Sequence, residues 1–145
     1  MKTSHIRVQD VEERWYLYDA SEHILGRMAA DIAMKLMGKD RPTYTPNSRL
    51  GAHVVVINAE KAVVTGQKDA QKEYRSYSGY AGGLYRTSIS EMRERKPHEV
   101  VKLAVRRMLP KTTLGKDMLA MLKVYGGPEH PHAAQKPVKV EATRS

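Results

Sequence analysis

The segment WYLYDASEHILGRMAADIAMKLMGKDRPTYTPNSRLGAHVVVI, residues 15–57, shows the clearest order of secondary structure in the chain. Trp15-Tyr16-Leu17-Tyr18 is a short aromatic and aliphatic run that suits a strand. Between residues 24 and 37 apolar side chains recur every three or four positions, which predicts an amphipathic helix ended by Gly38. Val54-Val55-Val56-Ile57 is apolar without alternation, which is typical of a strand covered on both faces. Strand, helix and buried strand in succession predict a βαβ unit and a parallel sheet.

The polar residues that follow the first strand have two interpretations. Asp19, Ser21 and His23 are the residue types of a hydrolytic triad. Their close spacing before a helix indicates capping instead, because the side-chain oxygens of Asp19 and Ser21 can accept hydrogen bonds from the first helical N–H groups. The chain also has no G-x-S-x-G motif and no pair of carboxylates in an apolar setting. The sequence therefore gives no support for catalysis.

Short extended segments follow the βαβ unit. Residues 62–66 predict a strand that ends in a glycine turn, and residues 72–78 predict an extended stretch that enters the glycine-rich loop 79–83. This loop resembles a cradle for a nucleotide phosphate, but it lacks the Lys-Ser/Thr pair of a P-loop. A nucleotide site is therefore not expected there.

Three further helices can be located by their first residues. Ser88 has capping-box spacing to the glutamate three positions later, so a helix should begin there. Pro97 suits the first position of the next helix, which a second proline ends. Thr112 or Thr113 can cap a short helix that runs to residue 121.

Length and composition predict one domain with extended ends. A chain of 145 residues can bury a sufficient core without disulfides or metals, and it has no cysteine for either. We expect an N-terminal arm (1–14), an α/β domain (15–127) and a C-terminal tail (128–145) that a partner would have to order. No apolar run is long enough to span a bilayer, and no signal core is visible, so we expect a soluble cytoplasmic protein.

Positive charge is concentrated near the carboxyl end. Residues 100–125 hold six basic residues and one acidic residue, a net charge of +5 out of +9 for the whole chain. An ordinary solvated face interleaves both signs, and a cluster of one sign repels itself unless an anion neutralises it. The pattern favours contact with nucleic-acid phosphates. The six predicted contacts are Lys102, Arg106, Arg107, Lys111, Lys116 and Lys123.

A second basic region, residues 68–86, interleaves cations with tyrosines and glycines. Glycines allow close approach of the backbone to RNA, and tyrosines can stack on unpaired bases or bind the 2′-hydroxyl. The chain has no phenylalanine, so Tyr74 or Tyr85 should pack in the core instead. The predicted RNA-binding residues here are Lys68, Lys72, Arg75, Tyr77, Tyr80, Gly82, Gly83 and Arg86, joined by Arg27 of the first helix.

His130-Pro131-His132 is a histidine pair that could share a metal ion. Only Glu129 is close enough in sequence to serve as a third ligand, and the intervening proline constrains the backbone. We therefore predict that His130 and His132 contact RNA, and we predict no metal or other cofactor.

Motifs along nearly the whole chain resemble those of the bacterial-type ribosomal protein L-thirteen family. The resemblance covers about residues 13–137. Any one short motif would be weak evidence, but many of them follow the family in the same order. These include Trp15-Tyr16, Leu25-Gly26-Arg27, Tyr44-Thr45-Pro46, Val64-Thr65-Gly66, Ser78-Gly79-Tyr80, Met108-Leu109-Pro110-Lys111, Leu122-Lys123-Val124-Tyr125 and His130-Pro131-His132-Ala133-Ala134-Gln135.

The resemblance implies a three-layer α/β/α domain around a mainly parallel four-stranded sheet. It also implies binding to large-subunit ribosomal RNA, a role early in subunit assembly, no enzymatic activity, and neighbours from the L-three and L-twenty families. We therefore expect a structural protein of the large ribosomal subunit of a bacterium. The alternatives are an RNA-directed enzyme with an α/β core and a free regulator that binds messenger RNA.

Overall fold

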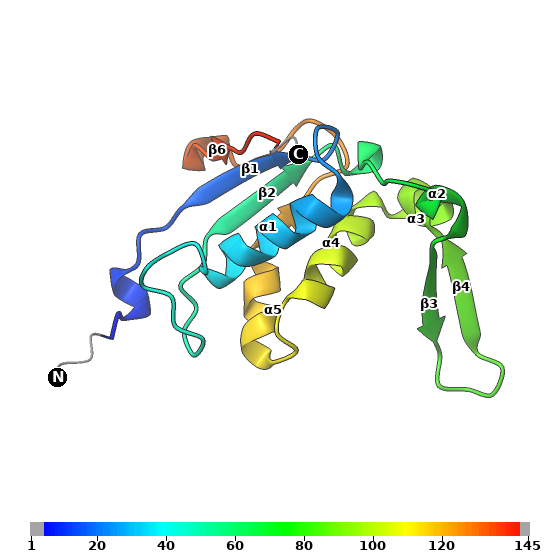
Figure 1. The fold of residues 1–145 in the computed structure, drawn as a ribbon, viewed down its shortest axis with the longest axis horizontal. Coiled ribbons are helices and arrows are strands. Elements are labelled where there is room, and N and C mark those ends of the chain that lie inside the picture. Colours follow the sequence, from blue (N-terminus) through cyan, green and yellow to red (C-terminus); the bar gives the residue numbers. More distant parts are fainter. Residues whose placement is uncertain (1–4, 143–145) are drawn as a thin grey trace.

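The βαβ unit predicted from residues 15–57 is present in the computed structural model, which describes residues 5–142 (Figure 1). Strands β1 (Trp15–Asp19) and β2 (His53–Ile57) are parallel neighbours, and helix α1 (Leu25–Met37) connects them. Gly38 ends α1 in the left-handed conformation, with φ +76°, as expected of a glycine after a helix. Residues 1–4 of the predicted arm and 143–145 of the predicted tail lie outside the described residues.

The main sheet has four strands in the order β5-β2-β1-β6, and each pairing in it is parallel. The α/β fold around a parallel four-stranded sheet is thus confirmed. Strand β5 (Leu122–Val124) pairs with β2, and the edge strand β6 (Val138–Lys139) pairs with β1. Because β6 comes from the predicted tail, the expectation that a partner must order that segment is wrong at these residues.

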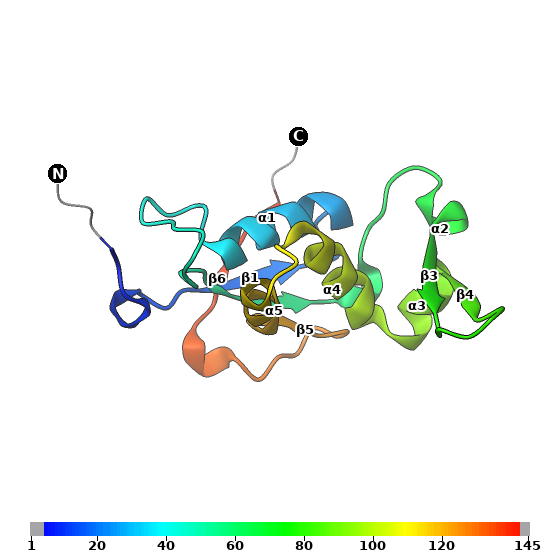
Figure 2. The same ribbon diagram turned by 90° about the horizontal axis from the view of Figure 1, so that it is seen from below.

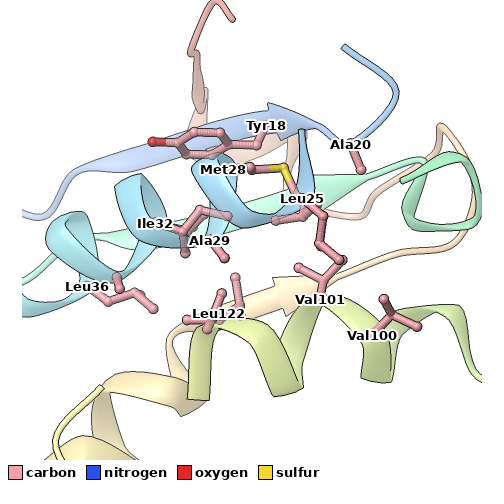
Figure 3. Packing of buried hydrophobic residues seen from close by; sticks show 14 of the residues in the cluster. Tyr18, Ala20, Leu25, Met28, Ala29, Ile32, Leu36, Val100, Val101 and Leu122 are labelled. Atoms are coloured by element: carbon pink, nitrogen blue, oxygen red, sulfur yellow. The ribbon is translucent and has the colours of Figure 1, made fainter. Parts of the chain in front are cut away.

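The core lies between one face of the sheet and the helices α1 and α4 (Pro97–Met108), as Figure 3 shows. Ile32 of α1, Val101 of α4 and Leu122 of β5 meet there, and each is at most 3% exposed. Removing such side chains from water is the main source of stability. Helix α4 is therefore fixed by its apolar face, and its other face is left to carry charge.

The opposite face of the sheet is covered by an irregular segment, residues 126–137, which contains the 3-10 turn η3 (Ala133–Gln135) (Figure 2). Trp15 of β1 stacks on His53 of β2 with ring centroids 4.4 Å apart, and His132 of the segment packs against Trp15 at 5.3 Å. Burial lowers the pKa of His53. These rings form the third layer of the domain.

Two details near α1 differ from the predictions. Residues 62–66 form no strand, because Val63 makes only an isolated bridge to Ile24 and is 42% exposed. Asp19 does not cap α1, whose N-cap is Ile24 with no side-chain hydrogen bond. The Asp19 carboxylate accepts hydrogen bonds instead from the backbone N–H and the hydroxyl of Ser21. It also accepts one at 3.0 Å from the side-chain amide of Asn58, which is distant in sequence.

A two-stranded antiparallel sheet, the β3–β4 hairpin, projects from the body of the domain (Figure 1). Strand β3 (Glu73–Tyr77) confirms the predicted extended stretch, whereas β4 (Leu84–Ser88) was not predicted. Short elements complete the chain: η1 (Val8–Asp10), η2 (Ala59–Lys61), α2 (Lys68–Gln71), α3 (Ile89–Arg95) and α5 (Thr113–Ala120).

Candidate nucleic-acid interface

Local sequence places α4 and α5 against each other at a tight turn. Pro97 is the first residue of α4, as predicted, and the Thr112 hydroxyl accepts from the Gly115 N–H at the start of α5. A Cβ atom at position 115 would lie 1.9 Å from the Pro110 carbonyl oxygen, so only glycine permits this approach. The close contact fixes the two charged helices relative to one another.

The six cations predicted near the carboxyl end line two adjoining hollows on α4, α5 and β5. The first hollow, of 430 Å³, lies between α4 and α5, and the second, of 620 Å³, lies between these helices and β5. Arg106 and Lys116 line both. Among residues 5–142, no aspartate or glutamate lines either hollow. The first holds Arg106, Arg107, Lys111 and Lys116, and the second holds Lys102, Arg106, Lys116 and Lys123.

A third hollow, of 210 Å³, extends the positive surface toward the hairpin. Lys68, Lys72 and Arg107 line it, and Arg107 also lines the first hollow. Burial lowers the pKa of Lys72, and the nearby Arg107 and Lys68 lower it further. We call the cations of the three hollows the basic strip. It consists of Lys68, Lys72, Lys102, Arg106, Arg107, Lys111, Lys116 and Lys123.

Mutual repulsion along the basic strip is relieved when an anion binds there. Phosphates spaced along a polynucleotide are the kind of anion that matches such a row of cations. The tyrosine ring of Tyr74 lies under this part of the surface, 5.5 Å from the Lys72 ammonium and 5.8 Å from the Arg107 guanidinium. These contacts hold two cations of the strip over one buried ring.

The β3–β4 hairpin presents cations and aromatic rings together. Arg75 and Arg86 lie directly opposite each other on paired strands, and both are exposed. Tyr77, which is 66% exposed, pairs with Leu84 one step further on the same face. Like charges directly opposite destabilise a strand pair, so this face also favours an anion. Tyr80, at the hairpin turn, is 79% exposed.

The hairpin turn depends on its glycines. Gly79 and Gly82 have φ values of +88° and +73°, in the region that favours glycine. Gly83 is buried, because its backbone pairs with Ser78 and Tyr80 across the turn. The loop is thus a shaped turn that holds Tyr80 away from the body.

The chain is similar to known ribosomal proteins. The family model "Ribosomal protein L13" matches residues 13–131. The chain belongs to the ribosomal protein L13 family. Large ribosomal subunit protein uL13 of Aquifex aeolicus is 52% identical over 141 residues, covering 97% of this chain and 98% of that protein. The protein of that name from Thermotoga maritima is 51% identical over 140 residues, covering 97% and 94%.

Membership of the ribosomal protein L13 family identifies the chain as a ribosomal protein, not an enzyme. The family predicted from the ordered motifs is thus confirmed. Within residues 5–142, no three metal-binding side chains lie close enough to hold an ion. Over the same range, each helix is too short or too polar to cross a membrane.

Three residues predicted to contact RNA, Arg27, His130 and His132, lie outside both the basic strip and the β3–β4 hairpin of this L13 family member. Arg27 is exposed on α1 and lines none of the three hollows in the described part of the chain. The His132 ring nitrogen Nε2 shares a 2.8 Å hydrogen bond with the Tyr125 hydroxyl. The backbone N–H of His132 donates to His130 Nδ1 at 3.2 Å. Both histidines therefore have structural partners, and their RNA contacts stay predictions.

Sequence reasoning missed the apolar floor of the first hollow. Leu103 and Leu119, both half-buried, and the buried Leu109 line it among the cations. The signal was present in part, because Leu103 stands three and four positions before the two arginines of α4 and so shares their side of the helix. The facing leucine of α5 could not be found without the packing of the two helices.

Proposed function

We propose that the chain is a structural constituent of the large ribosomal subunit that binds ribosomal RNA through its basic strip. The observation that carries the proposal is the gathering of the six C-terminal cations around two adjoining hollows that, among the described residues, no carboxylate lines. Family membership supports the ribosomal setting, since the matched relatives are named as large-subunit proteins.

RNA binding in this proposal has two physical parts. The strip supplies affinity, because each phosphate that a lysine or arginine neutralises releases condensed counterions. The hairpin and its glycine turn supply selection for RNA shape, because Tyr77 and Tyr80 can stack on unpaired bases. The same binding would support early assembly of the subunit in the bacterial cytoplasm, beside proteins that include members of the L-three and L-twenty families.

The test is the salt dependence of binding to large-subunit ribosomal RNA transcripts. We expect the double variant Arg106→Ala/Lys111→Ala to bind more weakly and to lower the log–log salt slope by about 1.4–1.8, because two phosphate contacts are lost. The control is Lys61→Ala/Arg95→Ala, which removes two exposed cations that lie outside the strip. An unchanged slope in the first variant, or an equal loss in the control, would contradict the proposal.

Sedimentation of a cell lysate separates the ribosomal role from that of a free regulator of messenger RNA. We expect the chain to travel with large subunits and to remain with them through a moderate-salt wash, since several phosphate contacts act together. A chain found mainly in the light fractions would favour the regulator.

A further inference from the structure

We propose that the hollow between α4 and α5 receives a single unstacked nucleotide of the bound RNA, with its base on the leucine floor and its phosphate on the cationic rim. This inference rests on the proposed RNA binding and assigns a ligand to one part of that surface. It concerns the first hollow, which Leu103, Leu109 and Leu119 floor and Arg106, Lys111 and Lys116 surround.

The hollow has the size of a ligand site. Its volume of 430 Å³ lies within the roughly 300–1,000 Å³ range of pockets that hold small molecules. Gly115 and Pro110 both line it, and a Cβ at position 115 would lie 1.9 Å from the Pro110 carbonyl oxygen. The two helices therefore hold the hollow open between them by their own packing.

The hollow has an apolar part and a cationic part, as a nucleotide has an apolar base face and an anionic phosphate. Leu103 of α4 and Leu119 of α5 each pack partly against the core and partly line the hollow, so apolar surface remains at its floor. Arg106, Lys111 and Lys116, which also line the hollow, are exposed residues. A nucleotide has an apolar base face at one end and a phosphate at the other, and it matches both parts at once.

Phosphates alone would not use the apolar floor. A regular RNA helix keeps its bases stacked and offers a concave site only its backbone, whereas a bulged or looped nucleotide can place its base in a pocket. Apolar contact with such a base adds binding that releases no counterions and therefore does not depend on salt. The structure thus favours a bulge or loop over a plain duplex at this point of the strip.

The first experiment titrates the full chain with adenosine 5′-monophosphate at low ionic strength and follows leucine methyl signals by NMR. Inorganic phosphate and adenosine serve as the two partial probes. We expect saturable shifts at Leu103 and Leu119 with the nucleotide, and weaker binding by at least about tenfold for either partial probe, because each uses only one part of the site. Equal binding of phosphate and nucleotide would overturn the inference.

A second probe tests a different kind of occupant. An acidic peptide that contains leucine could also place an apolar group on the floor and carboxylates on the rim. Tighter binding of such a hexapeptide than of adenosine 5′-monophosphate would assign the hollow to a neighbouring protein and overturn the inference.

A variant links the hollow to RNA and separates this inference from the proposed function. We expect Leu119→Gln to weaken binding to large-subunit RNA by about tenfold with an unchanged salt slope, because apolar contact is lost and charge is kept. Met34→Gln, at a 46% exposed methionine of α1 that lies outside the three hollows, is the control. If the unaltered chain binds RNA and the variant binds equally well, only the inference fails. If the unaltered chain binds no RNA, the proposed function fails.

Discussion

The basic strip and the β3–β4 hairpin carry similar side chains on very different supports. Four of the eight cations of the strip stand on α4 and α5. The inner face of α4 is closed into the core, where Val101 and Val105 are both 0% exposed. The hairpin has two strands, and of its rings only Tyr74 is buried, at 6% exposure. An isolated two-stranded hairpin is marginally stable, so its outer end can adjust. The strip is thus a fixed array of charge, and the hairpin is an adaptable extension.

This difference suits a division of roles, in which the basic strip binds phosphates by charge and the hairpin selects for RNA shape. Phosphates on a folded RNA have set positions, and a rigid array matches them without further loss of conformational entropy. Unpaired bases vary in position, and rings on a projecting ribbon can reach them. Substitutions should therefore separate into those that disturb stability, those that disturb affinity and those that disturb only local strand pairing.

The largest effect should come from the support of the strip. Gly115→Ala should lower the free energy of unfolding by about 3 kcal/mol, because the added Cβ meets the Pro110 carbonyl oxygen at 1.9 Å. Urea unfolding measures it. Gly79→Ala in the hairpin turn is the comparison, where the cost should be about 1 kcal/mol for φ +88° in open space. Equal losses for the two variants would remove the contrast between fixed and adaptable supports.

A middle effect should come from the rings of the hairpin. Tyr77→Ala should weaken RNA binding by about 2 kcal/mol, or about 30-fold, because one stacking contact is lost. The salt slope and the melting temperature should both stay unchanged, since the ring carries no charge and is 66% exposed. Tyr77→Phe is the matched control and should keep most of the affinity. A lower slope for Tyr77→Ala would mean that the hairpin acts through charge, as the strip does.

The smallest effect should come from the opposed arginines of the hairpin. Arg86→Gln should raise the free energy of unfolding by about 0.3 kcal/mol at low salt, because Arg75 no longer faces a like charge. Urea unfolding in low salt and in 1 M salt checks this prediction. The gain should vanish in 1 M salt, where charges are screened beyond about 3 Å. A gain that persists there would point to strand propensity as its cause.

Elements with a strong local signal could be predicted from sequence. The helical spacing of residues 24–37 and the unbroken apolar run at Val54–Ile57 gave α1 and β2 because burial on one or both faces leaves a periodic record. The hydroxyls of Ser88 and Thr112 gave the starts of α3 and α5 for an equally local reason. The family could be predicted because its short motifs follow one another along nearly the whole chain.

Elements that depend on distant partners could not be predicted. Strand β4 is largely exposed, so its residues show no alternation of apolar and polar side chains. Val138 and Lys139 become a strand only because the edge of β1 is open to them. The six cations could be named as one cluster because they lie close together in sequence. The leucine floor of the first hollow could not be predicted, because it forms only when α4 and α5 pack together.

Strand β6 has a consequence for how the protein is made. It pairs with Tyr16 and Leu17 of β1, and the Val140 N–H that follows it donates to the Leu17 carbonyl oxygen, so the contact joins segments more than about 120 positions apart in sequence. A newly synthesised chain can form α1 and the β1–β2 pair early, but β6 cannot pair with β1 until residues 138–140 have left the exit tunnel. Contacts so distant in sequence form slowly. Pairing of β6 should therefore be the last step in forming the sheet, and a chain cut before Val138 should leave β1 with an open edge.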